Sequence, residues 1–451
     1  MEFESILRGF IGIVLLVGLA FLLSNNKSKI NWRLVLGGLG LQLVFAILIL
    51  KGEDLRLFFS PLGWIKDFFN WISYFFVLLL NFTYEGAKFV FGDLAKAPGT
   101  EGSLGSFFAF QVLPTIIFFA SLMSILYYLG IMQVIVKGMA WIMARTLGTS
   151  GAESLSCSAN IFVGQTEAPL IIRPFLKGMT RSELLTIMIG GMATIAGGVM
   201  AAYIQILGSA YAIKHGIPLE QAQQLFATHL LGASVMAAPA GIVISKILIP
   251  EIEESETKGS VKIDIEKNAA NIIEAASNGA ADGWKLAINV GAMLLAFIGL
   301  IALVNYLLNG LGNLVGVNSY LISTFGQPLS FQLIIGLVLQ FVAFGIGVPW
   351  EDALNFGSLL GIKVVLNEFV AYSEMGIFIE TGKILSEKSI LMLTYALCGF
   401  ANLSSIAIQI GGIGPLAPNR KSDIASLGIK AVVGGVLATL MTATLAGLLF
   451  S

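Results

Sequence analysis

The chain has 451 residues, of which 56% are hydrophobic and 12% are charged, and its mean hydropathy is +0.87. This composition is far too apolar for a soluble domain of that length, so we expect an integral membrane protein. The apolar runs are long enough for helices that cross roughly 30 Å of hydrocarbon, whereas a membrane β-barrel would show short alternating segments. A net charge of −1 without a basic stripe gives no reason to expect a nucleic acid polymer as a partner.

Eight apolar segments predict membrane-spanning helices. They are residues 6–24, 33–50, 106–129, 182–207, 224–249, 284–309, 388–411 and 424–450. The first segment is followed by Lys27, Lys29 and Arg33 and by no A-x-A-like cleavage site, so we interpret it as a retained span and not a signal peptide.

Two further segments predict helices at the membrane surface. Residues 60–80 begin with Ser60-Pro61, a helix start, and mix aromatic and charged residues, which favours an interfacial position. From Lys262 to Ser277, apolar residues recur at helical spacing among charged ones, which predicts an amphipathic surface helix.

Basic residues indicate the orientation of the chain. They cluster after the first predicted span, before the fourth and before the last. Because loops rich in Lys and Arg stay in the cytoplasm, we expect both termini on the outer side of the plasma membrane, in a bacterium the inner membrane.

Two polar clusters interrupt apolar segments in the two halves of the chain. Gln165, Thr166 and Glu167 set an amide, a hydroxyl and a carboxylate side by side, and Asn367 precedes Glu368 in the same way. Intramembrane ionisable residues usually face a cavity or a pathway, so both carboxylates are candidates for a functional site, and we expect them to be partners.

Residues 152–176 and 351–376 carry these clusters. Polar residues interrupt both segments too strongly for ordinary lipid-facing helices. Non-helical backbone at membrane depth is tolerated where it is buried in protein or lines water. We therefore expect two re-entrant hairpins, each with its polar cluster at the tip. Cys157 and Cys398, both in apolar surroundings, are interpreted as small core residues.

The hairpins belong to an internal repeat. A helix predicted at 131–147 ends at Gly148 before the first hairpin, and one at 329–347 ends at Gly347 before the second. After the hairpins, spans begin at a capping box, Thr180 to Glu183, and at Ser386. Because an odd number of spans separates the two units, we expect inverted repeats, as in secondary transporters.

This repeat divides the chain into four parts. They are residues 1–105 with the N-terminal helices and interfacial segment, 106–249 with the first repeat, 250–283 with the amphipathic surface segment, and 284–451 with the second, inverted repeat.

The predicted pocket combines the hairpin tips with polar residues of the interrupted spans that follow. It contains Gln165, Thr166, Glu167, Glu368, Asn402 and Ser405. Lys363 is the only basic residue near a tip, so the solute should be uncharged and dense in hydrogen-bonding groups. A carboxylate can accept two bonds from a vicinal diol and an amide can pair with a base edge, so a ribonucleoside suits both.

Three motifs carry a family resemblance. Gly164-Gln165-Thr166-Glu167-Ala168-Pro169-Leu170, Asn367-Glu368-Phe369-Val370-Ala371-Tyr372 and Cys398-Gly399-Phe400-Ala401-Asn402-Leu403-Ser404-Ser405-Ile406 resemble the signature motifs of concentrative nucleoside transporters. The resemblance implies a cation-coupled nucleoside importer. It also implies a homotrimer in which each protomer holds a scaffold part and a mobile transport part.

The resemblance further implies roles for individual residues. Those implied to read the nucleobase are Gln165, Thr166, Glu167 and Val199; those implied for the ribose are Glu368, Asn402 and Ser405, with Phe400 lining the pocket. The implied sodium ligands are Asn160, Val163, Thr194 and Ile195. The Gln-Thr-Glu-Ala-Pro form is more similar to sodium-coupled members than to proton-coupled ones, so sodium is the coupling ion that we expect.

Other interpretations remain open from the residues alone. Glu167 and Glu368 could brace the hairpins, Asn402 and Ser405 could bond across helices, and Thr194 could bond back to its own helix. We do not expect an enzyme, because no Ser-His or His-x-x-x-His arrangement is present. Proton coupling and a nucleoside-responsive channel or sensor without coupled transport are the alternatives.

Overall fold

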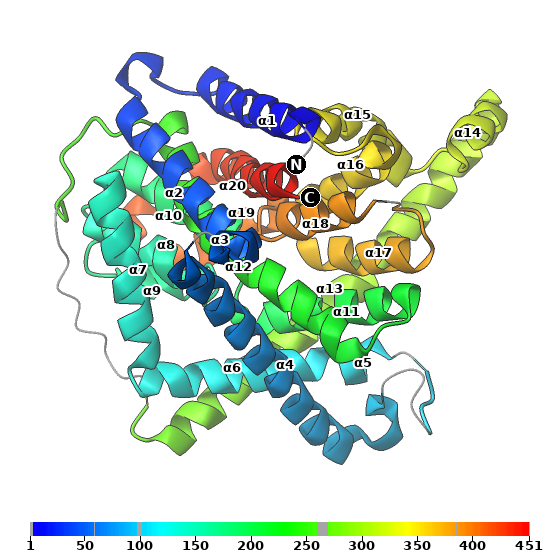
Figure 1. The fold of residues 1–451 in the computed structure, drawn as a ribbon, viewed down its shortest axis with the longest axis horizontal. Coiled ribbons are helices and arrows are strands. Elements are labelled where there is room, and N and C mark those ends of the chain that lie inside the picture. The colour runs from blue at the N-terminus through cyan, green and yellow to red at the C-terminus, as the bar shows by residue number, and fades with distance from the viewer. Residues whose placement is uncertain are drawn as a thin grey trace.

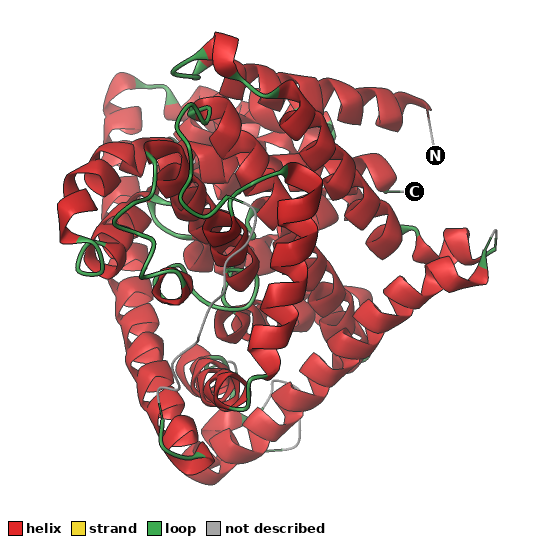
Figure 2. Cartoon of the chain, turned by 90° about the vertical axis from the view of Figure 1, so that its left-hand side faces the viewer, coloured by secondary structure: helices red, strands yellow, loops and turns green. Residues whose placement is uncertain are grey.

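The computed structural model describes residues 3–57, 59–96, 102–105, 107–258, 269–384 and 386–450. Over these ranges every regular element is a helix, as Figure 2 shows. Seven helical stretches of the described chain are long and apolar enough to cross a membrane, and one bent helix pair is a further candidate. The expected all-α polytopic fold is confirmed.

The N-terminal part consists of four helices and three short 3₁₀ turns. They are α1 (Phe3–Leu22), η1 (Lys27–Lys29), α2 (Trp32–Leu50), α3 (Gly52–Arg56), η2 (Ser60–Leu62), α4 (Gly63–Phe91) and η3 (Gly92–Ala95). In Figure 1, α1 runs above α20, against which it packs, while α2 packs on α12.

Residues 60–80, which the sequence predicts at the membrane interface, form part of a longer helix. These residues lie in and just before α4, which has 29 residues and with η3 is long and apolar enough to span the membrane. The hydroxyls of Ser73 and Thr83 donate to carbonyls one turn earlier, those of Phe69 and Leu79. Because these polar groups are satisfied within the helix, they do not need the water of the interface.

The first repeat begins with α5 (Phe108–Gln111), α6 (Leu113–Tyr128) and α7 (Ile131–Leu147), and α7 ends at Gly148 as predicted. Its hairpin consists of α8 (Gly151–Ala159), a non-helical tip and α9 (Ala168–Ile171). A broken span follows, made of α10 (Arg181–Ala193) and α11 (Gly197–His215), and then the long α12 (Leu219–Leu248). The predicted capping box of Thr180 and Glu183 is present at the start of α10.

The second repeat has the same order of elements. After α13 (Ile272–Val315), α14 (Asn318–Phe325) and α15 (Phe331–Gly345), its hairpin consists of α16 (Trp350–Val365) and α17 (Glu368–Glu380). The broken span is α18 (Glu387–Ala396) with α19 (Leu403–Ile413), followed by η4 (Pro418–Arg420) and the long α20 (Lys421–Leu449). α15 and α16 are bent by 119° relative to one another.

Hydrogen bonds between the repeats show that they are inverted. The start of α10 lies beside the start of α20, where Arg181 Nη2 donates to Ser426 Oγ at 3.1 Å. The start of α18 lies instead beside the end of α11, where the Tyr211 hydroxyl donates to Glu387 Oε2 at 2.9 Å. The two broken spans therefore begin on opposite sides of the molecule, which confirms the inverted arrangement.

The expected amphipathic helix from Lys262 to Ser277 is only partly within the described chain, since residues 262–268 lie outside it. Residues 269–271 are not helical, and the Asn271 side chain caps α13 by accepting from the Glu274 amide at 2.9 Å. Residues 272–277 are thus the first turns of a 44-residue helix and not the end of a separate surface helix. The expectation is wrong here because Asn at an N-cap begins a helix instead of continuing one.

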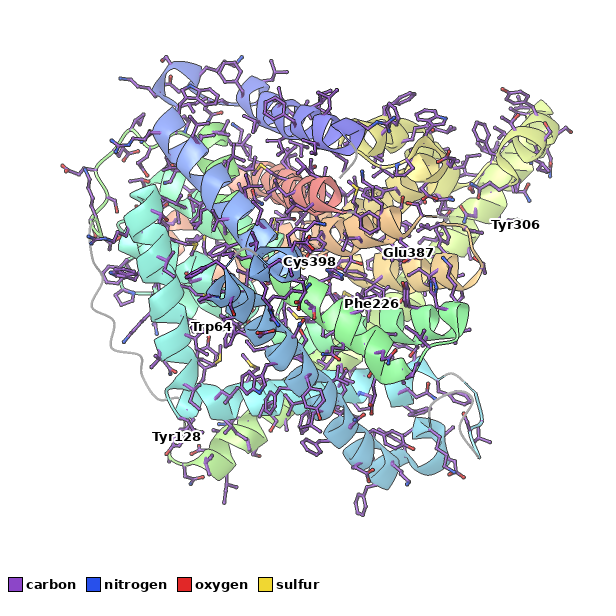
Figure 3. The ribbon with its side chains drawn as sticks, in the orientation of Figure 1. Trp64, Tyr128, Phe226, Tyr306, Glu387 and Cys398 are labelled. Carbon is purple, nitrogen blue, oxygen red and sulfur yellow. The ribbon has the colours of Figure 1, made fainter. Side chains whose placement is uncertain are left out.

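α13 packs along α6 and extends beyond the central helices. A Cβ at Gly283 would lie 2.7 Å from Ile117 Cα, so this close contact requires glycine. Further along, Tyr306 is 76% exposed and lies far from the centre of the molecule in Figure 3. By contrast, α12 is buried along its apolar length and packs on α10, α11 and α20. The core therefore lies where the hairpins and broken spans meet.

Candidate functional site

The two broken spans contact each other at their breaks. The break in the first repeat spans residues 194–196, and the break in the second spans 397–402. Gly399 has φ of +152°, and a Cβ there would lie 2.7 Å from the Met192 carbonyl oxygen and 2.9 Å from that of Ala193. Glycine therefore allows the second break to reach the carbonyl end of α10, where backbone groups have no helical partners.

Two asparagines shape the helix starts that face this region. Asn367 Oδ1 accepts from the Val370 amide at 2.9 Å and caps α17, while Asn402 Oδ1 accepts from the Ser405 amide at 2.9 Å and caps α19. Asn is favoured at N-caps because its side-chain oxygen satisfies an unpaired helical amide. Glu368, the first residue of α17, lies at a helix end that carries positive partial charge and favours a carboxylate.

Glu368 is 5% exposed and accepts hydrogen bonds at both carboxylate oxygens. The Tyr203 hydroxyl of α11 donates to Oε1 at 3.1 Å, and Asn402 Nδ2 donates to Oε2 at 3.0 Å. An ionised carboxylate has about four acceptor sites, so two remain for a ligand. These contacts join the tip of the second hairpin to broken spans from both repeats.

Gln165, at the tip of the first hairpin, is bonded to the same region. Its Nε2 donates to Ser405 Oγ at 3.0 Å, and its Oε1 accepts from Gln409 Nε2 at 3.1 Å. Gln409 also donates to the Met188 carbonyl at 2.9 Å. A continuous chain of contacts therefore runs from Gln165 through Ser405 and Asn402 to Glu368, and it links the two hairpin tips.

The other residues of the predicted pocket differ in burial. Thr166 is half-buried against α19, where a Cβ at Gly412 would lie 2.6 Å from Thr166 Cγ2. Val199 is buried on α11, and Phe400 is half-buried in the break before α19.

Glu167 is exposed, and its carboxylate makes no hydrogen bond to another described residue. Its amide donates to the Gly164 carbonyl at 3.2 Å in a tight turn, and its carboxylate folds back over the Gly164 Cα. Glu167 and Glu368 have no direct contact among the described hydrogen bonds, and the connection between the tips runs through Gln165. The Glu167 carboxylate is consequently free to accept bonds from a ligand.

The predicted sodium ligands lie between the first tip and the break before α11. Gly197, the first residue of α11, donates its amide to the Phe162 carbonyl at 3.0 Å and fixes this approach. Asn160 is 1% exposed, and neither polar atom of its amide has a hydrogen-bond partner among the described residues. A buried unpaired amide oxygen is costly, and it suits a hard cation that binds neutral oxygens.

The remaining sodium candidates add less direct support. Ile195 is buried and Val163 is half-buried. Because their side chains are hydrocarbon, each would contribute only a backbone carbonyl. The Thr194 hydroxyl donates to the Gly190 carbonyl at 2.8 Å, which is the bond within its own helix that the sequence left open. Its oxygen retains an acceptor site for a cation despite that bond.

Sequence reasoning missed two residues of the network, Tyr203 and Gln409. Each stands four positions after a predicted site residue on the same helix, Tyr203 after Val199 and Gln409 after Ser405. Residues four apart lie on one helix face, so the helical period could have identified both.

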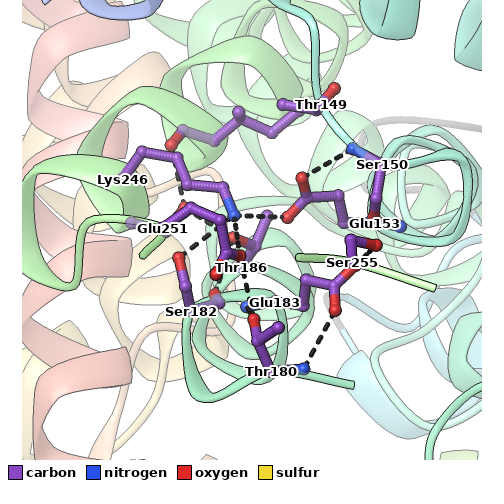
Figure 4. Close-up of polar contacts among 12 residues, drawn as sticks. Thr149, Ser150, Glu153, Thr180, Ser182, Glu183, Thr186, Lys246, Glu251 and Ser255 are labelled. Atoms are coloured by element: carbon purple, nitrogen blue, oxygen red, sulfur yellow. Dashed lines mark hydrogen bonds and ion pairs between the residues drawn. The ribbon is translucent and has the colours of Figure 1, made fainter. Parts of the chain in front are cut away.

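A buried ionic cluster fixes the base of the first hairpin, far along α12 from the tip (Figure 4). Lys246 Nζ lies 2.8 Å from Glu153 Oε2 on α8 and 3.3 Å from Glu251 Oε2, and it donates to Ser182 Oγ on α10 at 3.1 Å. A buried charge persists only when it is paired and hydrogen-bonded. The cluster therefore ties α8, α10 and α12 together, so that the hairpin is anchored at its base.

Comparison with known proteins agrees with this architecture. Family models described as the N-terminus and the C-terminus of the Na+ dependent nucleoside transporter match residues 11–94 and 229–447, and a nucleoside recognition model matches residues 109–210. An uncharacterized transporter of Haemophilus influenzae is 45% identical over 447 residues, which are 98% of each chain. Sodium/nucleoside cotransporter 1 of Rattus norvegicus is 41% identical, over 98% of this chain and 64% of the rat protein.

Solved structures of CNTnw have the same fold. Its inward-facing substrate-bound structure gives a TM-score of 0.83 at 40% identity over 99% of this chain and 98% of that one. A doubly substituted variant in an outward-facing state gives 0.85 at 39% identity over 99% of each chain. Paired hairpins, crossed broken spans and these likenesses define a helical membrane transporter. More particularly, the chain belongs to the concentrative nucleoside transporter family.

Proposed function

We propose that this chain is a sodium-driven symporter that imports nucleosides by alternating access. The observation that carries the proposal is the hydrogen-bonded chain from Gln165 to Glu368, which brings amides, a hydroxyl and a carboxylate together between two hairpin tips. Such a site has many donors and acceptors for an uncharged solute. Relatives described as sodium/nucleoside cotransporters support the same substrate class and ion.

The geometry suggests how the two parts of a nucleoside are bound. Glu368 and Asn402 would bind the ribose hydroxyls, since the carboxylate retains acceptor sites and lies next to the amide that donates to it. Ser405 would complete the ribose contacts. Gln165, Thr166 and the exposed Glu167 would bind the nucleobase edge, with Val199 and Phe400 supplying the apolar surface against which the base lies.

Sodium would be held by Asn160 and Thr194 together with the backbone carbonyls of Val163 and Ile195. The bound ion supplies positive charge between the first hairpin tip and the start of α11. The unpaired amide of Asn160 supports this site, because a cation would satisfy an oxygen that the described protein leaves without a partner. The hydrogen bond from Gly197 to the Phe162 carbonyl and the anchored base of the first hairpin position these ligands.

The remaining proposals concern the assembly and its surroundings. The protein would lie in the plasma membrane, in a bacterium the inner membrane, with both termini on the outer side. Copies would associate as a homotrimer, as the resemblance to the family implies. The division at residues 105, 249 and 283 would separate the N-terminal helices, the two repeats and the segment between them.

The test is calorimetric titration of the purified protein with uridine in sodium chloride and in potassium chloride of equal ionic strength. We expect uridine to bind in both solutions, with higher affinity in sodium. Asn160→Ala should abolish the difference between the salts. Ser154→Ala removes a hydroxyl that donates to the Ser150 carbonyl at the base of the hairpin, and it should preserve the difference. Absence of uridine binding would refute the nucleoside site, and equal affinities for the unsubstituted protein would refute sodium coupling.

A further inference from the structure

A buried lysine lies beside the second hairpin tip. Lys363 is on α16, three residues before the tip begins at Leu366, and it is 0% exposed. Its Nζ donates to the Ala396 carbonyl at 2.8 Å and to Thr439 Oγ1 at 3.0 Å. These contacts join the second hairpin to the end of α18 and to the middle of α20.

The position of Ala396 explains what the ammonium group does. Ala396 is the last residue of α18, after which the chain leaves the helix to form the break that contains Gly399 and Asn402. The last carbonyls of a helix have no helical partner and carry negative partial charge, which a cation stabilises.

Around the tip of the first repeat lie the corresponding hairpin, broken span and long helix, but among the described residues no lysine or arginine side chain joins them there. There the long helix contacts the hairpin through Ser234, whose hydroxyl donates to the Ile161 carbonyl at 3.2 Å. The side chain at the end of the first hairpin helix is the neutral Asn160, which has no partner among the described residues. Within the described chain, the first repeat thus has an amide oxygen without a partner at Asn160, and the second repeat has the ammonium group of Lys363.

We propose that Lys363 is a fixed cation of the second repeat, in the place that the coupling ion takes in the first. This inference rests on the proposed function for its first half, the ion near Asn160. Lys363 is a positioning residue: it does not contact the nucleoside, but it holds the end of α18 and so sets the break that places Asn402 against Glu368. The nucleoside site would then lie between two cations, one mobile and one permanent.

Chemical rescue tests the proposal. Lys363→Ala removes the charge and leaves space for a small ammonium ion, so uridine affinity should fall by about tenfold or more, as for the loss of charge-assisted hydrogen bonds. Ethylammonium chloride should restore much of that affinity, whereas the neutral 1-propanol should not. Thr444→Val, which removes a buried hydroxyl that bonds within α20, should bind uridine as the unsubstituted protein does.

A second variant covers the case in which Lys363→Ala does not fold. Lys363→Met fills the space without a charge, so it should bind uridine at least about tenfold more weakly and should not respond to ethylammonium. Unchanged affinity in Lys363→Met, or equal rescue of Lys363→Ala by ethylammonium and 1-propanol, would overturn the proposal.

The rescue experiment on Lys363 and the test of sodium coupling can fail independently of each other. If the unsubstituted protein binds uridine equally in sodium and potassium, sodium coupling fails. Selective rescue of Lys363→Ala by ethylammonium in potassium chloride would still establish Lys363 as the fixed cation of the second repeat. Its failure in sodium chloride, with normal sodium dependence in the unsubstituted protein, would refute only the role of Lys363.

Discussion

Glu368→Gln should separate ribose recognition from the role of a structural brace. The substitution preserves the shape of the side chain, and its amide oxygen can accept from Asn402 while its amide nitrogen donates to the Tyr203 oxygen. The contact with Asn402 is therefore retained, and the contact with Tyr203 is replaced by one in which Tyr203 accepts instead of donating. What is lost is the negative charge at the acceptor sites that face a ligand.

The size of the effect follows from the hydrogen bonds that the ribose would make. Bonds to charged groups are worth about 1.5–3 kcal/mol and neutral ones about 0.5–1.5 kcal/mol, so losing the charge at one ribose hydroxyl should raise the Kd for uridine by roughly tenfold. Deoxyuridine, with one hydroxyl fewer, should lose less affinity on the same substitution. Free uracil, without a sugar, should bind with unchanged affinity.

Calorimetric titration of uridine, deoxyuridine and uracil against both proteins measures these differences. Glu374→Gln is the matched control, because Glu374 lies on the same helix α17 but takes no part in the network around Glu368. Equal losses for all three ligands in Glu368→Gln would show that the carboxylate braces the hairpin and does not contact ribose.

Three further perturbations follow from the same geometry. Thr194→Val removes a proposed sodium ligand, so the sodium concentration for half-maximal uridine uptake should rise while thermal stability stays the same; an unchanged sodium dependence would exclude this hydroxyl. Cysteines at Gln165 and Leu366 should react with polar thiol reagents from opposite sides of the membrane in different states, and labelling of both from one side under all conditions would contradict alternating access. Lys246→Met leaves two carboxylates without their buried partner, which should destabilise the protein by about 3–5 kcal/mol and lower its Tm in detergent. Lys258→Met, at an exposed site, should leave the Tm unchanged.

Features with a local cause could be predicted from the sequence. The helix end at Gly148, the capping box at Thr180 and the two hairpins follow from residues close together in the chain. Carboxylates in apolar segments identified the tips because a charge there is costly unless it has a function or a partner.

Features that depend on tertiary contacts could not be predicted in this way. Gln165 and Ser405, whose side chains are bonded, are 240 positions apart, and no local pattern indicates that pairing. The extent of α4 was missed because its charged and aromatic start, including Trp64 and Lys66, resembles an interfacial helix. The apolar run that follows extends this helix to spanning length, and α4 packs on α12.

Uridine accumulation in proteoliposomes tests the central proposal most directly. With an inward sodium gradient and equal pH on both sides, uridine should accumulate inside above its external concentration, and collapse of the gradient should release it. Glu368→Gln should reduce accumulation at low uridine concentration. Full accumulation driven by a pH gradient in sodium-free buffer, or uridine equilibration without accumulation under a sodium gradient, would contradict sodium-coupled nucleoside symport.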